Sequence, residues 1–161
     1  MDVDELRAVL EVGTVVPAVN QIEYHPYMRR TNIELLTLME CHRIKTSGFD
    51  CLAPITKVRD ALVPEVLAPM AERYSVTKEA LLIRWALDEN VAPVIRVPLE
   101  AKIEECLSTL RFGLTDSDRL LITVKGYENR HPQWLPIEWD ELPENKPPGN
   151  QPPGNQLPGT S

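Results

Sequence analysis

Basic residues and long apolar runs are both scarce in this sequence. Its 161 residues include 17 lysines and arginines against 24 aspartates and glutamates, which gives a net charge of −7. No basic stripe is available to neutralise nucleic-acid phosphates, so we expect no nucleic-acid partner. No apolar run approaches the ~20 residues of a membrane span, and the acidic start MDVDELRAVLEV is unlike a signal peptide. We therefore expect no membrane association.

Cysteine is equally sparse. Cys41, Cys51 and Cys106 are odd in number and lack the spacing of metal ligands. This pattern indicates reduced thiols in a cytoplasmic protein without a metal site. One of them could be a catalytic nucleophile, although a free cysteine more often behaves as a small apolar residue.

The remaining pattern alternates helices and strands. Helical spacing or capping residues predict six helices: over 2–12, after Thr31, from Pro64, after Thr77, over 100–110 and over 116–124. We expect a kink at Pro69 in the third of these helices. Thr115 and Asp118 resemble a capping box at the start of the last one. Strands are expected over 15–23, 44–49 and 91–97. This order predicts an α/β domain, residues 1–131, with about three parallel strands joined by helical crossovers.

The C-terminal part has a different composition. Residues 132–146 contain Trp134 and Trp139 and suggest an extended aromatic segment. Residues 147–161 read PPGNQ-PPGNQ-LPGTS, a polar proline-glycine repeat with little to bury. We expect that tail to be disordered and partly polyproline II.

Three segments resemble the aldo-keto reductases. They are PAVNQIEYHPY (17–27), IKTSGFDCLAPI (44–55) and VIRVPLEAKIEECLSTLRFGLTDSD (94–118). They are similar to the sixth, seventh and eighth barrel strands of that family with the segments that follow them. The resemblance implies the C-terminal half of a TIM-type barrel, because a complete barrel needs about 250 residues.

The same resemblance implies what the chain lacks. The family carries its Asp, Tyr, Lys and His hydride-transfer tetrad on strands that precede residue 1, and no tyrosine or histidine of this chain matches those positions. A carbonyl reductase needs a proton donor whose pKa is tuned by a neighbour. We therefore expect that this chain is not an autonomous NADPH reductase.

The cofactor positions are better preserved. Arg43 replaces a glycine at a helix end, where a positive φ is often required, and Asp50 and Cys51 replace a serine and a proline. Asp50 would place an unfavourable negative charge near a pyrophosphate. The resemblance implies that no cofactor is required and that residual NADP(H) binding would use the following residues: Gln21, Phe49, Arg96, Lys102 and Glu105.

Three residues are candidates for acid–base catalysis. Strand alternation from Gln21 places Glu23 on the inward face near the C-terminal rim, where barrel enzymes do chemistry. His25 follows in the next turn, and Asp50 leaves the next strand at the same rim. Together they could donate and accept protons on a small-molecule ligand, although Glu23 and His25 also belong to the family signature and fit a structural role.

Three functional hypotheses remain. The first is a repurposed enzyme that catalyses a redox-independent isomerisation, cyclisation or elimination. The second is a non-catalytic partner subunit or an NADP(H)-binding remnant, and the third is an inactive truncated product. Three strands cannot close a barrel, and Pro93 suits a strand at a sheet edge. We therefore expect a homodimer, or a second chain that covers the open face.

Overall fold

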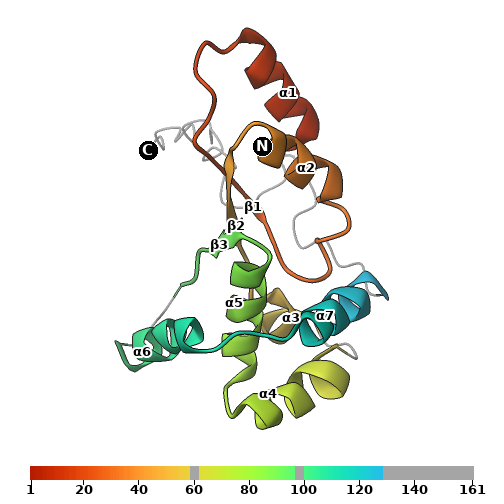
Figure 1. Cartoon of the computed structure of the whole chain (residues 1–161), viewed down its shortest axis with the longest axis vertical. Coiled ribbons are helices and arrows are strands. Elements are labelled where there is room, and N and C mark those ends of the chain that lie inside the picture. The colour runs from red at the N-terminus through yellow and green to blue at the C-terminus, as the bar shows by residue number, and fades with distance from the viewer. Residues whose placement is uncertain (59–61, 97–99, 129–161) are drawn as a thin grey trace, which may run out of the picture.

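Three parallel strands form a single sheet in the order β1-β2-β3 (Figure 1). The computed structural model describes residues 1–58, 62–96 and 100–128. The strands are β1 (Val19–Glu23), β2 (Lys45–Phe49) and β3 (Val91–Pro93). The expected α/β architecture with three parallel strands is confirmed, and the described strands do not close into a barrel. Both segments beyond residue 131, the aromatic one and the proline-glycine tail, lie outside the described residues.

Two of the strands are shorter than expected. β1 begins at Val19 rather than at residue 15, and Pro17, which has no N–H to offer a neighbouring strand, precedes it. β3 ends at Pro93 rather than at residue 97, at an edge of the sheet. The ladder continues by one bond, because the backbone N–H of Val94 donates to the carbonyl of Gly48 at 2.7 Å. Proline at an edge strand agrees with the expectation from the sequence.

Seven α-helices and two shorter helical turns complete the described part of the chain. The single helix expected from Pro64 is divided into two segments, the π-helical η1 and the helix α4. Pro64 lies within η1 and Pro69 in the first turn of α4, and each lacks the backbone N–H that a continuous helix would use at that position. The bounds are α1 (Val3–Val12), α2 (Ile33–Cys41), α3 (Ala53–Thr56), η1 (Leu62–Leu67), α4 (Ala68–Tyr74), α5 (Lys78–Asp88), α6 (Glu100–Ser108), the 3-10 turn η2 (Thr109–Arg111) and α7 (Asp116–Glu128).

Local capping explains where several helices begin. Asp2 and Glu5 form a capping box at α1, and Thr77 caps α5 by accepting from the Ala80 N–H at 3.1 Å. At α7, Thr115 Oγ1 accepts from the N–H of Asp118 at 3.2 Å, as expected, but the return bond of the capping box is not formed, because the Thr115 N–H donates to the Tyr74 hydroxyl at 3.2 Å. Thr31 was expected to cap α2, but this prediction is wrong: the N-cap is the following residue, Asn32, whose side chain instead donates to the Glu23 carbonyl at 2.9 Å.

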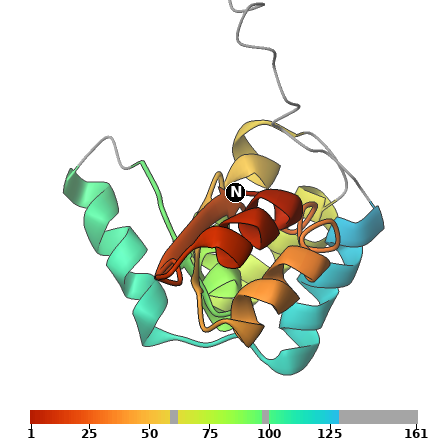
Figure 2. The same cartoon turned by 90° about the horizontal axis from the view of Figure 1, so that it is seen from above.

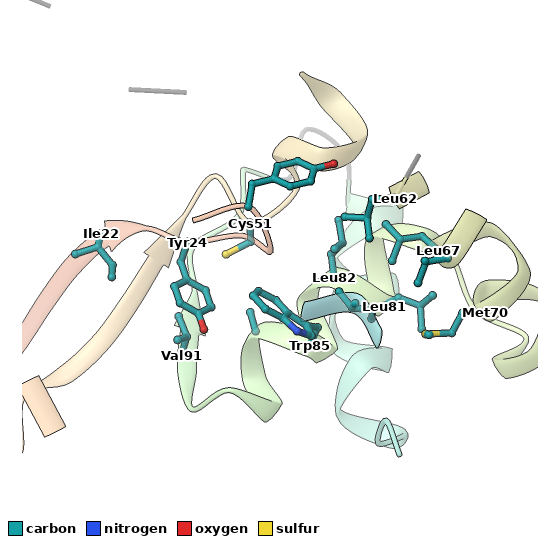
Figure 3. Packing of buried hydrophobic residues seen from close by; sticks show 14 of the residues in the cluster. Ile22, Tyr24, Cys51, Leu62, Leu67, Met70, Leu81, Leu82, Trp85 and Val91 are labelled. Carbon is teal, nitrogen blue, oxygen red and sulfur yellow. The ribbon is translucent and has the colours of Figure 1, made fainter. Parts of the chain in front are cut away.

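The core lies between the sheet and α5. The ring of Trp85 stacks on Tyr24 with centroids 5.3 Å apart, and its indole N–H donates to Thr123 Oγ1 of α7 at 3.0 Å. Figure 3 shows this pair with Leu81 and Val91 around it. Seen from above, α6 lies at one side of the molecule and α7 at the other (Figure 2).

α7 approaches the turn after β1 through a glycine. A Cβ on Gly126 would stand 2.5–2.6 Å from the Cβ, carbonyl carbon and carbonyl oxygen of Pro26. Two of those atoms belong to the backbone, so a side-chain rotation cannot relieve the clash. The absence of a side chain at Gly126 therefore sets the distance between α7 and the turn.

We expect Gly126→Ala to lower the free energy of unfolding by about 2 kcal/mol, because overpacking costs ~1–3 kcal/mol. In an unhindered helix the same change would stabilise by ~1 kcal/mol. Urea denaturation measures the difference. Gly113→Ala is the matched control, since a Cβ at Gly113 meets nothing within 4 Å. A Gly126→Ala protein as stable as the wild type would show that α7 does not pack on Pro26 in this way.

Candidate functional site

The C-terminal ends of β1 and β2 meet at one rim. Parallel pairing aligns Glu23 with Phe49, and the ladder continues because the N–H of Tyr24 donates to the Phe49 carbonyl at 3.0 Å. The candidate residues Glu23, His25 and Asp50 therefore all leave the sheet at the same end, as the sequence predicted.

Glu23 and His25 form a buried pair. His25 Nε2 lies 3.0 Å from Glu23 Oε1, and the side chains are 0% and 7% exposed. A neutral imidazole that donates Nε2–H to the carboxylate keeps Nδ1 as an acceptor. Nδ1 is buried and has no hydrogen-bond partner among the described residues. The rings of His25 and Tyr27 pack edge to face, with their centroids 5.5 Å apart. The pair can hold and move a proton, but its histidine is closed to solvent.

Asp50 has a different partner. Its carboxylate forms an ion pair with Lys57, and its φ of 58° lies in the left-handed region. The lysine offsets the negative charge that we expected to disfavour a nearby pyrophosphate. The described contacts join Glu23 to His25 and Asp50 to Lys57, and the sequence pattern did not indicate this role for Lys57.

Cys51 is buried beside this rim. Its thiol donates to the carbonyl of Gly48, with 3.3 Å between the two heavy atoms. Burial raises the pKa of Cys51 to about 12, so the side chain is a neutral thiol at physiological pH. This agrees with the apolar role expected for it and not with a nucleophile.

Two cofactor candidates lie on the open face of the sheet. The register places Gln21, Ser47 and Ala92 side by side, with Glu23 and Phe49 one pleat further along. Gln21 is exposed, and its Nε2 donates to Ser47 Oγ at 3.5 Å. The helices cover the opposite face, which carries buried residues such as Ile22 and Val91. Gln21 and Phe49 therefore share a face at neighbouring strands.

The other cofactor candidates lie beyond β3. Arg96 is exposed, whereas Glu105 already accepts a hydrogen bond from the Thr77 hydroxyl at 2.6 Å. The side chain of Lys102 lies outside the described residues. The cationic position at Arg96 is thus open to an anion, while Glu105 is partly committed to the start of α5.

Relatives identified by sequence are reductases. The chain is 27% identical over 116 residues to an "NAD/NADP-dependent indole-3-acetaldehyde reductase" of Schizosaccharomyces pombe, matching 72% of this chain and 41% of that protein. It is 26% identical over 144 residues to an "NADPH-dependent alpha-keto amide reductase" of Saccharomyces cerevisiae, matching 87% and 45%. No protein-family model matches. The chain spans under half the length of these relatives.

Solved structures agree. An aldo-keto reductase from a Medee basin deep-sea metagenome superposes with a TM-score of 0.72 at 20% identity, over 88% of this chain and 50% of that one. The protein Gox0644 superposes with a TM-score of 0.67 at 27% identity, over 77% and 44%. The chain resembles part of an aldo-keto reductase.

The family resemblance drawn from the sequence is thereby confirmed, and one of its local consequences is visible. Arg43, which stands where the family has a glycine, has a φ of 58° after the end of α2. A positive φ is what the resemblance to a family position held by glycine implied for this residue. No described helix has the length and apolarity that a bilayer span requires.

Proposed function

We propose that this chain forms the NADP(H)-facing part of an aldo-keto reductase-like barrel. Reduction then requires a complementary polypeptide segment that supplies the proton donor. Both relatives are named as NAD- or NADPH-dependent reductases, and this chain spans under half of their length. The proposal assigns cofactor contacts to this chain and the reaction centre to the assembled barrel.

The observation that carries this proposal is the arrangement of Gln21 and Phe49. They project from adjacent parallel strands onto the open face, near the rim where barrel enzymes bind ligands. An amide beside an aromatic ring suits a planar carboxamide-bearing ring such as nicotinamide. Lys57 offsets the charge of Asp50 at the same rim, and Arg96 offers an exposed cation for a phosphate.

Three of the four described tyrosines support the need for a second segment. Tyr24 and Tyr27 are fully buried, and the hydroxyl of Tyr74 donates to Asp118 at 2.6 Å. Burial and the nearby Glu89 carboxylate raise the pKa of Tyr24 well above its ordinary range. These groups are poorly placed to protonate a bound carbonyl compound, which agrees with the expectation drawn from the sequence.

NADPH should bind weakly to the isolated chain, and a double Arg96→Ala, Lys102→Ala variant should lose at least tenfold in affinity. Each charge-assisted hydrogen bond to a phosphate contributes about 1.5–3 kcal/mol. Titration followed by NADPH fluorescence measures the affinity. Arg111→Ala, which removes another exposed arginine away from the rim, should bind like the wild type.

The same samples should oxidise no NADPH when an aldehyde is added, because the proposal assigns the proton donor to the complementary segment. Equal affinity in the double variant and the wild type would place the cofactor elsewhere. Steady cofactor oxidation that depends on both protein and aldehyde would show that the isolated chain is a complete reductase.

The buried Glu23–His25 pair favours a second candidate, a redox-independent acid–base enzyme. The 3.0 Å contact gives an imidazole held by a carboxylate, the arrangement that general bases use. Because His25 is 0% exposed, this candidate requires the turn at residues 24–27 to open. Turnover of a substrate without a nicotinamide cofactor that is lost in His25→Gln would favour it over the first proposal.

A partner for the open structure is part of the same proposal. Both outer strands of the described sheet have one unpaired edge. The open face itself is less apolar than we expected, with Gln21, Lys45 and Ser47 among its residues. Exposed apolar residues instead form a stripe along α6 and η2, made up of Ile103, Leu107 and Leu110. We propose that a second copy of this chain covers this stripe when no other polypeptide is bound.

Leu107→Lys should therefore shift the isolated protein toward monomer, because it places a charge in the apolar stripe. Light scattering on size-exclusion fractions at micromolar concentration measures the mass. Leu120→Lys on α7 is the control, since Leu107 and Leu120 are similarly exposed, at 56% and 61%. A wild-type monomer, or the same effect in both variants, would remove the stripe as a dimer contact.

A further inference from the structure

A cleft of about 510 Å³ lies between α2 and the end of α5 over the start of β2, at the opposite end of that strand from Phe49. Its volume falls within the range of small-molecule sites, ~300–1,000 Å³. Most of its lining residues carry a polar or charged group, although more of the lining surface is apolar than polar. The lining residues come from the turn after β1, from α2 and the start of β2, and from the end of α5: Tyr24, Arg29, Leu36, Glu40, Arg43, Ile44, Lys45, Thr46, Glu89 and Asn90.

One lining group has an unmet hydrogen-bond capacity. Tyr24 is 0% exposed, and its hydroxyl has no hydrogen-bond partner among the described residues. A buried hydroxyl without a partner is costly, so such groups in native proteins call for an explanation. Tyr24 is one of the residues that line the cleft, so the missing partner is assigned to a ligand oxygen that accepts a hydrogen bond from the hydroxyl once a neighbouring side chain moves aside.

The charges of the cleft favour an anion. Arg29 donates to Glu89 at 2.7 Å, and Arg119 lies 3.7 Å from the other Glu89 oxygen, so Glu89 is already compensated. Arg43 and Lys45 form no ion pair within the described ranges, and they stand against the single carboxylate of Glu40. This cationic excess occurs in a chain whose net charge is −7.

The backbone at the cleft is also unusual. Arg43 and Asn90 have φ values of 58° and 61°, the left-handed region that favours glycine. Local strain of this kind is often retained at ligand sites. At Arg43 it holds a long cationic side chain at the wall of the cleft, where a glycine would give the same backbone without the charge.

We propose that this cleft binds a phosphorylated sugar. Arg43 and Lys45 bind the phosphate, since arginine and lysine are the usual phosphate ligands in proteins. Glu40 and Asn90 offer acceptors and an amide for sugar hydroxyls, and Tyr24 donates to an oxygen of the ring. Lys45 is the first residue of β2, whereas the proposed NADP(H) contacts lie at Gln21, at the last residue of β2 and beyond β3, so the two proposals can be tested independently.

D-Ribose 5-phosphate is the test ligand, with D-ribose and inorganic phosphate as its two parts. It should raise the unfolding temperature of the full chain and give a saturable calorimetric titration, because a ligand specific to the folded state stabilises it. Tyr24→Phe keeps the stack on Trp85 and should lower the affinity about tenfold, the value of one hydrogen bond. Arg43→Gly suits the backbone and should reduce binding further.

Arg30→Ala, an exposed arginine outside the cleft, and Arg96→Ala on the cofactor side should both bind like the wild type. No thermal shift at millimolar ligand would overturn the proposal. Unchanged affinity in both Tyr24→Phe and Arg43→Gly would overturn it as well, as would inorganic phosphate binding as tightly as the sugar phosphate. The melting temperatures of both variants without ligand distinguish lost binding from lost structure.

Discussion

The stack of Tyr24 on Trp85 is the contact on which most of this structure depends. It joins the turn after β1 to α5, and the indole N–H extends the connection to Thr123 of α7. Gly48 of β2 makes the stack possible, because a Cβ there would lie 3.0 Å from the Cβ of Tyr24 and 2.8 Å from Val91. Sheet and helices therefore meet around one aromatic pair.

This packing divides the chemistry of the molecule between two sides. The helix-covered side buries Tyr24, and the turn that follows buries His25 with it. The open side leaves Gln21 exposed and Phe49 half-buried. Groups on the buried side can act on a ligand only through the cleft between α2 and α5 or after local opening. In the proposed barrel, the complementary segment would enclose a ligand that lies against the groups on the open side.

Much of the local structure is formed although the sheet is open. Short-range interactions hold each unit in place: the capping box at Asp2, the Thr77 cap and the hydrogen bonds of Thr115. None of these requires the barrel to be closed. The exposed stripe on α6 and η2, by contrast, is an apolar surface that a larger assembly would cover.

The sequence by itself indicated the alternation of helices and strands and the caps at Thr77 and Thr115, because these depend on residues within one turn or one strand, and the family resemblance indicated the positive φ at Arg43. Only the tertiary structure decided that Lys57 pairs with Asp50, that Asn32 turns from its helix to the Glu23 carbonyl, and that Tyr24 lines a charged cleft. The first two contacts join residues seven and nine positions apart across a loop or a turn, whereas the cleft brings together segments that are distant in sequence. Helix and strand patterning carries no information about which side chains meet in either case.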